Sequence, residues 1–591
     1  MAGQRLVADL VVDRLRDWGV HRLFGYSGDG INGFMGALRR AGGDPEFVQA
    51  RHEENAALMA VGHAKYTGGI GVVTSTQGPG AVHLLNGLYD AKLDHQPVVA
   101  IVGQQPTTAL GAEYQQEIDL TSLFKDVAAQ YVQAVLAPEQ AQMVLDRAFR
   151  TALATRSPCV VILPHDVQVA PAPDALPHEH GVVPTSVQWR PPRVVPHDVD
   201  LAAAAEVLDA GERVALLVGQ GARGAGGQVR AVAERLGAGV TTSLLGKPFW
   251  DETLPTSCGV MGHLGTTASG WLLDQCDTLL IVGSNDPWTE FYPAPGQARA
   301  VQVDIDGRHL GNRYPVEVGL VGDAAETLGA LLPRLRPRDG WRADVEDRVR
   351  EWHDLAERRA GTAARPLSPE RVVRALSPCL PADAQVSVDV GSVVYWYARH
   401  LTLPPGVPAH LSSTLASMGS GLPYGLAAKL HAPDRPLVAL VGDGAMQMNG
   451  ISELVTVAHC WREWADPRFV VLVLHNQELA EVTWEQRETE GDPRFAASQA
   501  LPEFPYAAYA DLLGLTGIRI SSPDEVDAAW DRALAADRPV VLEAVVDPDV
   551  PLLPPFPAGR EKLDSFRRGL DQEETGGHAR ELLDEQAGQE E

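Results

Sequence analysis

Two polar side chains follow apolar runs of the sequence where a magnesium and diphosphate site would be expected. Asp443, followed by Gly444, comes directly after the run Leu437–Val441, and Asn476 follows the next such run, Phe469–Leu474. The carboxyl ends of neighbouring parallel strands meet at one edge of a sheet, so both side chains are expected there. Their oxygens are hard ligands suited to Mg²⁺. Taken alone, a Gly-Asp-Gly sequence is also compatible with a simple turn.

Three further segments carry residues that could bind an anion or move a proton. Gly391 and Ser392 follow the predicted strand Gln385–Val388 and would offer N–H groups and a hydroxyl at a helix start. Glu53 opens a second predicted helix, where a glutamate commonly only stabilises the helix dipole. Met418 stands among small residues and fits either a protein core or a position beside a bound heterocycle.

Composition excludes several classes of function. The 591 residues carry 49 basic and 77 acidic side chains, a formal net charge of −28, which opposes binding to nucleic acid or anionic lipid. No run of 18 apolar residues is present, which excludes a transmembrane helix. The first residues lack the basic and apolar regions of a signal peptide, and the five cysteines have no metal-ligand spacing. We therefore expect a cytoplasmic protein with reduced thiols.

The elements that must position these residues are buried parallel strands alternating with helices. Fully apolar runs bounded by glycine or polar turns predict an α/β fold with three doubly wound parallel-sheet domains. Proline-rich stretches at 169–196 and 365–369 mark the linkers. The predicted division is 1–180, 195–335, 365–550 and a C-terminal tail, 551–591. Residues 571–591 carry eight acids and one arginine, so we expect this end to be mobile, with at most a short helix around Leu582.

Together these motifs are similar to those of the thiamine-diphosphate (ThDP) enzymes related to pyruvate oxidase and acetohydroxyacid synthase. The resemblance extends from residue 1 to about 570, and the pyruvate oxidases look closest. The segments that carry it are Arg51-His52-Glu53, Gly78-Pro79-Gly80, Asp389-Val390-Gly391, Met418-Gly419 and Gly442-Asp443-Gly444 with Asn476.

The resemblance implies a catalytic role for three of these positions. Glu53 matches the glutamate that hydrogen-bonds N1′ of the cofactor's pyrimidine and favours the tautomer that takes the proton from thiazolium C2. Met418 matches the apolar residue that supports the bent cofactor, and Gln116 lies in the matching substrate loop. The same resemblance implies a homodimer or homotetramer, because the family's pyrimidine and diphosphate sites lie on different chains.

Binding residues are implied in the same way. Asp443, Asn476 and the backbone carbonyl of Glu478 match the Mg²⁺ ligands. The remaining matches to ThDP-binding positions are Gly28, Gly78, Pro79, Gly391, Ser392, Gly442, Gly444 and Ala445. Central segments resemble those that hold FAD in pyruvate oxidase and acetohydroxyacid synthase, and their residues are Gly221, Gly262, Gly283, Asp304 and Asp323. FAD-free relatives keep the same fold, so FAD binding is a hypothesis.

Three functions remain open at this point. The first is pyruvate oxidase-like decarboxylation of a 2-oxo acid, with FAD as the electron acceptor. The second is an acetolactate synthase-like carboligase, in which FAD is structural or absent. The third is a non-catalytic cofactor-binding protein, against which the intact Glu53 argues.

The sequence also departs from the family pattern. Gln115 replaces an aromatic residue of the substrate loop, which favours a more polar 2-oxo acid or acceptor than pyruvate. His475 replaces the first asparagine of an Asn-Asn pair, and we interpret it as a packing residue at a strand end. The quinone-dependent relatives carry a C-terminal membrane-binding helix. Here only a short apolar stripe precedes the acidic tail, which argues against membrane association.

Overall fold

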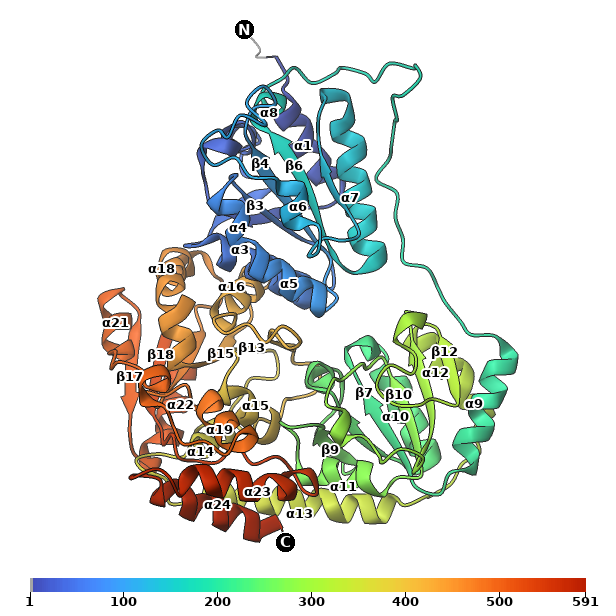
Figure 1. Ribbon diagram of the computed structural model, residues 1–591, viewed down its shortest axis with the longest axis vertical. Coiled ribbons are helices and arrows are strands. Elements are labelled where there is room, and N and C mark those ends of the chain that lie inside the picture. The colour runs from blue at the N-terminus through green and yellow to red at the C-terminus, as the bar shows by residue number, and fades with distance from the viewer. Residues whose placement is uncertain (1–3, 591) are drawn as a thin grey trace. The chain divides into compact units, whose positions relative to one another are not determined.

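Three six-stranded parallel sheets organise the chain (Figure 1), as predicted. The structure is a computed structural model and describes residues 4–590. Internal contacts group the described residues into two compact units. The first comprises residues up to Pro191 together with His410–Arg435 and Gln447–Pro467. The second comprises Pro192–Ala409, Pro436–Met446 and the residues from Arg468 onward.

The first unit contains one sheet. In spatial order its strands are β2 (Glu46–Gln49), β1 (Arg22–Gly25), β3 (Gly71–Ser75), β4 (Val98–Gln104), β6 (Pro158–Pro164) and β5 (Val132–Ala134). Strands β3, β4 and β6 are buried at every residue, as their apolar sequences require, whereas the edge strands β2 and β5 are only partly buried. The helices of this unit are α1 (Val7–Asp17), α2 (Asn32–Arg40), α3 (Glu53–Thr67), α4 (Pro79–His83), α5 (Leu85–Leu93), α6 (Leu120–Phe124), α7 (Ala141–Thr155), α8 (His165–Gln168), α16 (Gly421–His431) and α18 (Ile451–Cys460).

Helix α3 lies at the centre of the first unit. It begins at Glu53, as predicted, with the His52 side chain accepting the N–H of Glu54 at 3.2 Å. It ends at Gly68, whose φ of 71° suits glycine. Nearly all of its residues are buried, because it packs against β3, α5 and α16. A helix with apolar residues on every side is stable only in such surroundings.

The second unit contains the central and C-terminal sheets. The central sheet runs β12 (Val318–Val321), β11 (Arg299–Asp304), β10 (Thr278–Val282), β7 (Val214–Val218), β8 (Gly239–Thr242) and β9 (Ser257–Val260). The C-terminal sheet runs β14 (Ala409–His410), β13 (Gln385–Val388), β15 (Leu437–Gly442), β16 (Phe469–His475), β18 (Val540–Val545) and β17 (Thr516–Ile520).

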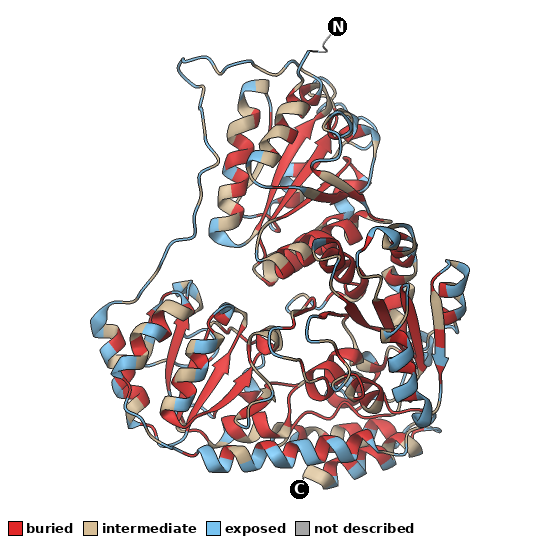
Figure 2. Ribbon diagram, turned by 180° about the vertical axis from the view of Figure 1, so that it is seen from behind, coloured by how far each residue is buried: buried red, intermediate tan, exposed pale blue. Residues whose placement is uncertain are grey.

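Alternating residues of β7 show how the central sheet is covered on both faces. Leu216 packs in one cluster with α9 (Asp198–Ala210), α10 (Gly226–Leu236) and α12 (Ala324–Leu331). Its neighbour Leu217 packs in another cluster with α11 (Thr267–Gln275) and α13 (Arg342–Ala360). Successive side chains of a strand point to opposite faces, so the sheet is doubly wound. Every residue of β7 is buried, and Figure 2 shows the strands of the sheets as largely buried.

The other helices of the second unit accompany the C-terminal sheet and the end of the chain. They are α14 (Pro369–Arg374), α15 (Ser392–His400), α17 (Asp443–Ala445), α19 (Ala480–Thr489), α20 (Ala496–Gln499), α21 (Tyr506–Leu512), α22 (Val526–Leu534), α23 (Ala558–Leu570) and α24 (Gly577–Glu590).

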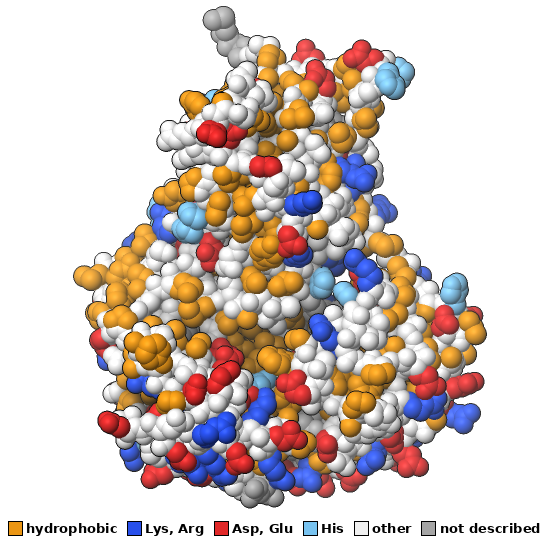
Figure 3. All heavy atoms as spheres, in the orientation of Figure 1, with side chains coloured by type: hydrophobic (Ala, Val, Ile, Leu, Met, Phe, Trp, Pro, Cys, Tyr) orange, Lys and Arg blue, Asp and Glu red, His pale blue; other side chains and the backbone are white. Residues whose placement is uncertain are grey.

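The end of the chain differs from the mobile tail that we expected. Residues 577–590 form α24, which buries Leu583 completely and packs against α23. Glu590 forms a buried ion pair with Arg359 of α13 at 2.7 Å. Around α23 and α24, basic and acidic side chains alternate on the surface (Figure 3), and Arg567 and Arg580 both pair with Asp584. The prediction of a mobile tail was wrong because these pairs offset the acidic charge.

The proline-rich linker has the character that its sequence predicts. Residues 175–197 contain no helix or strand and are largely exposed. No helix of the described chain combines the length and the apolar character needed to cross a bilayer. The predicted domain boundaries stay predictions, although the three sheets follow one another in the predicted order.

Candidate active site

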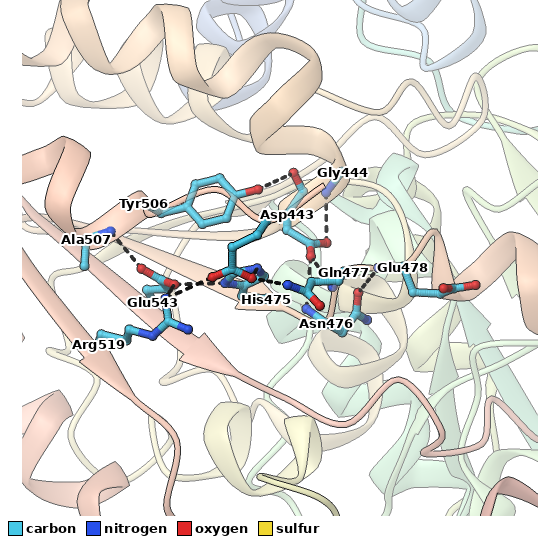
Figure 4. Close-up of polar contacts among 11 residues, drawn as sticks. Asp443, Gly444, His475, Asn476, Gln477, Glu478, Tyr506, Ala507, Arg519 and Glu543 are labelled. Carbon is cyan, nitrogen blue, oxygen red and sulfur yellow. Dashed lines mark hydrogen bonds and ion pairs between the residues drawn. The ribbon is translucent and has the colours of Figure 1, made fainter. Parts of the chain in front are cut away.

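The carboxylate of Asp443 connects two strand ends of the C-terminal sheet (Figure 4). Asp443 begins α17 directly after β15, and its Oδ2 accepts the backbone N–H groups of Asn476 at 3.0 Å and Gln477 at 2.6 Å. Its Oδ1 accepts the N–H of Gly444 at 2.9 Å. The sheet therefore brings Asp443 and Asn476 together at the carboxyl ends of β15 and β16, as predicted.

The turn after β16 orients the other predicted metal ligands. Asn476 Oδ1 accepts the N–H of Glu478 at 3.0 Å, and Gln477 has a left-handed φ of 57°. The Glu478 side chain accepts Arg494 Nε at 2.8 Å and the Thr483 hydroxyl at 2.6 Å. With the carboxylate engaged in this way, the backbone carbonyl is the group of Glu478 that suits the metal role implied by the resemblance.

The donor set and the free space at this edge fit a magnesium diphosphate. Asp443 is 2% exposed, and burial raises its pKa to about 6, opposed by the N–H of Gln477. A divalent cation would favour the ionised carboxylate. A Cβ added at Gly391 or Gly442 would meet no atom within 4 Å, so both positions leave room for a ligand. Gly391 has a φ of 124° and precedes Ser392, the first residue of α15.

His475 is the last residue of β16 and pairs with a carboxylate inside the sheet. Its Nδ1 lies 2.9 Å from Glu543 Oε1, which also accepts Arg519 Nη1 at 2.7 Å. The other Glu543 oxygen accepts the N–H of Ala507 at 2.9 Å. Tyr506 donates its hydroxyl to the backbone carbonyl of Asp443 at 3.2 Å. His475 is therefore buried in an ion-pair network next to Asp443, which differs from the simple packing role that we expected.

In the first unit, Glu53 places a nearly buried carboxylate at the N-terminus of α3. Glu53 is 9% exposed, and its Oε2 lies 2.9 Å from Nδ1 of His83 at the end of α4. A Cβ added at Gly80 would lie 3.2 Å from Glu53 Oε1, so glycine keeps that oxygen accessible. Pro79 begins α4 directly after Gly78. Glu53 Oε1 can therefore accept a hydrogen bond at the start of α3, which is what the implied contact with the cofactor's pyrimidine requires.

Hydrogen bonds of Gln77 connect segments of the first unit that carry other residues predicted to bind the cofactor or the substrate. Gln77 donates to Gln116 Oε1 at 3.0 Å and to Asp29 Oδ1 at 3.2 Å. Gln116 is exposed and has a φ of 63°. A Cβ at Gly78 would lie 2.7 Å from the Gln116 side chain, and one at Gly28 would lie 2.5 Å from Thr76. The glycines therefore allow the substrate loop and the loop after β1 to approach β3 closely.

The predicted FAD residues gather at the carboxyl ends of the central strands. Gly221 donates its N–H to the carbonyl of Gly283 at 3.0 Å, and a Cβ at either glycine would collide with the other loop. Asp304 ends β11, and burial raises its pKa. Asp323 is an exposed cap of α12 that accepts the N–H of Glu326 at 3.1 Å. Gly262 has a φ of 87°, and a Cβ there would lie 3.0 Å from Trp288.

Helix α19 carries acidic residues that our sequence analysis did not single out. Burial raises the pKa of Glu481 to about 8, with a contribution from the neighbouring Glu485. The pKa of Tyr395 on α15 is raised well above its usual value, chiefly by burial and then by the charge of Glu481. The Tyr395 hydroxyl forms a hydrogen bond with His263 Nδ1 at 2.6 Å. His263 Nε2 lies 2.8 Å from Glu488. The sequence feature that could have identified this pair is the i, i+4 spacing of Glu481 and Glu485 on a helix that follows the turn at Asn476.

Three parallel sheets covered by helices, a glutamate at a helix start and an aspartate beside an asparagine at two strand ends are the features that the resemblance to ThDP-dependent enzymes implies. Three segments match family descriptions, and the chain belongs to the thiamine pyrophosphate enzyme family. They are the N-terminal TPP binding domain at residues 5–123, the central domain at 201–331 and the C-terminal TPP binding domain at 389–544.

Individual relatives support the same assignment over nearly the whole chain. The chain is 34% identical to the thiamine pyrophosphate-containing protein YdaP of Bacillus subtilis, over 92% of each chain. It is 31% identical to the pyruvate oxidase of Lactiplantibacillus plantarum, over 95% of this chain and 91% of the relative. It is 32% identical to the acetolactate synthase isozyme 2 large subunit of Escherichia coli, over 95% and 99%.

Proposed function

We propose that the chain is a ThDP- and Mg²⁺-dependent enzyme that decarboxylates a 2-oxo acid and passes two electrons to FAD. The observation that carries the proposal is the Asp443 carboxylate, which orients the turn at Asn476 beside glycines that leave room for a diphosphate. Glu53, nearly buried at the start of α3, supplies the carboxylate that the chemistry needs. The relatives include both a pyruvate oxidase and acetolactate synthases, so the carboligase is the second candidate.

The chain's own residues would divide the work as follows. Asp443, Asn476 and the Glu478 carbonyl would hold Mg²⁺, and the N–H group of Ser392, beside the open space at Gly391, would bind the diphosphate. Glu53 would accept a hydrogen bond from the pyrimidine and favour its proton-accepting tautomer. Bound ThDP would supply a nucleophile for the 2-oxo acid and an electron sink for its decarboxylation. Gln116 would position the substrate.

Reduction of FAD during turnover is the property that distinguishes the two candidate activities. Gly221, Gly283 and Asp304 lie at adjacent strand ends of the central sheet, where nucleotides bind in open α/β sheets. We propose that these residues, with Gly262 and Asp323, hold FAD and that it is reduced during turnover. We also propose a cytoplasmic homodimer or homotetramer without membrane association, on the basis of the family resemblance and the acidic composition.

Decarboxylation with a flavin readout tests the proposal. The protein is loaded with ThDP, Mg²⁺ and FAD and given a panel of 2-oxo acids without oxygen, with and without a dye acceptor. Release of CO₂ with bleaching of the flavin band supports the oxidase, and Glu53→Gln serves as the inactive control. Release of CO₂ with an oxidised flavin and a carboligation product would instead identify the transferase. No CO₂ from any 2-oxo acid would contradict both.

A further inference from the structure

The residues on either side of Met418 are held in place by two asparagines. Met418 is partly buried in the loop 411–420 of the first unit, here called the Met418 loop. Asn86 of α5 donates to Ser417 Oγ at 2.6 Å. Asn449 lies against Gly419, where an added Cβ would be 2.9 Å from Asn449 Nδ2. Both neighbours of Met418 therefore have a fixed contact.

Both asparagines converge on a single oxygen of Glu54. Asn86 Nδ2 donates to Glu54 Oε1 at 2.8 Å, and Asn449 Nδ2 donates to the same oxygen at 3.2 Å. A carboxylate oxygen can accept two such bonds, and bonds to an ionised acceptor are stronger than neutral ones. Glu54 directly follows Glu53 at the start of α3, so the two carboxylates share one rigid backbone segment.

A second anchor holds the other end of the Met418 loop. Asp94 accepts the N–H groups of Ser413 and Thr414, each at 2.9 Å. Lys65 of α3 pairs with Asp94 at 2.7 Å, and both side chains are buried. Lys65 also donates to the carbonyl of Leu411 at 2.5 Å. Between the two anchors, Ala416 has a left-handed φ of 56°, which a free loop would relax.

We propose that Glu54 is a positioning residue that sets the place of Met418 through Asn86 and Asn449. This inference rests on the proposed function, in which Met418 supports the bound cofactor. Glu53 would act on the cofactor and Glu54 on the protein, so adjacent glutamates have separate tasks. Loss of the Glu54 acceptor would release Ser417 and Gly419, and the side chain between them would lose its fixed position.

The first test uses the protein without cofactor. In Glu54→Ala, hydrogen–deuterium exchange of the peptide covering 411–420 is expected to rise about tenfold, because the local contacts that protect it are lost. Asn449→Ala removes only one of the two hydrogen bonds to Glu54 Oε1, so it should give a smaller rise in exchange. Asp146→Ala is the matched control, since Asp146 is a buried carboxylate of the same unit that binds Arg14 and Trp18. It should destabilise the unit without changing exchange in the Met418 loop.

The second test measures exchange of the C2 proton of bound ThDP, with no 2-oxo acid present. Glu54→Ala should slow this exchange about tenfold, within the range that positioning effects reach, with the affinity for Mg²⁺–ThDP changed less than about threefold. Glu54→Gln keeps an acceptor oxygen and should restore the native rate. In a Met418→Ala background, Glu54→Ala should add less than about threefold, because Glu54 acts through Met418.

Two results would overturn the inference. One is unchanged exchange of the Met418 loop in both Glu54→Ala and Asn449→Ala. The other is an equal effect of Glu54→Ala with and without Met418, which would make the glutamate's role independent of that side chain. Neither measurement involves a 2-oxo acid, so failure of the proposed reaction would show itself separately, as absence of CO₂ release by the native protein.

Discussion

Asp443 Oδ2 lies 2.6 Å from the backbone nitrogen of Gln477, so one carboxylate connects the ends of β15 and β16. The two residues are 34 positions apart in the sequence. Because the carboxylate already orders the turn that carries Asn476, a metal bound there would meet ligands that are in place. Such preorganisation lowers the entropic cost of binding.

Replacement of Asp443 should therefore impair cofactor retention more than stability. Asp443→Asn keeps one acceptor for the turn but removes the charge that Mg²⁺ needs, and we expect the affinity for Mg²⁺–ThDP to fall at least about 100-fold. Equilibrium dialysis or calorimetry measures the change. Asp527→Asn, which removes a surface ion pair with Arg371, is the control and should bind normally. Native affinity in Asp443→Asn would refute the metal assignment.

Glu53→Gln should separate cofactor activation from cofactor binding. The amide keeps the size and a hydrogen-bonding group but removes the carboxylate, so we expect exchange of the C2 proton to slow at least about 100-fold, the lower end for a positioned acid–base group. ThDP should still bind. Glu54→Gln should exchange at close to the native rate. If Glu54→Gln were the inactive variant, the assignment of the first unit would be shifted by one residue.

The half-buried His63 should make the first unit sensitive to acid. Burial lowers the pKa of His63 to about 4, from 6.5. Between these values the unfolded chain binds a proton that the folded chain does not, so stability falls as the pH falls through this window. The loss relative to His63→Leu should reach about 3 kcal/mol at pH 4. Denaturant unfolding from pH 7 to pH 4 measures it, with the exposed His178→Gln as control. Equal pH dependence in native protein and His63→Leu would contradict this.

The buried pair of Arg359 and Glu590 should hold α24 in place. The two side chains are 3% and 1% exposed, and Glu590 also accepts the N–H of Phe556 at 2.9 Å. Glu590→Gln leaves the guanidinium without its counter-charge, and we expect a loss of about 3 kcal/mol in the free energy of unfolding. Thermal unfolding and limited proteolysis of α24 report the effect. Glu585→Gln, at an exposed position, should be neutral. A native response of Glu590→Gln to protease would show that this ion pair does not hold α24 in place.

The sequence by itself determined the strands and the ends at which the polar residues of the site lie. The runs Leu437–Val441 and Phe469–Leu474 became β15 and β16, and Glu53 became the first residue of α3. These features are local: a parallel strand buried on both faces must be apolar along its length, and a helix start has its own residue preferences. Asp443 and Asn476 then meet because neighbouring parallel strands end at one edge.

Only the tertiary structure decided what the polar side chains bind. Asn449 reaches Glu54 from 395 positions away, and nothing in either segment specifies the partner. Glu590 finds Arg359 in the same way, which turned an acidic stretch that looked mobile into a packed helix. A side chain's local sequence sets its charge and its face on a helix, whereas its partner depends on which other element packs there. Glu53 and Glu54 have the same side chain on consecutive residues, and the packing of α4, α5 and residues 447–450 gives them different partners.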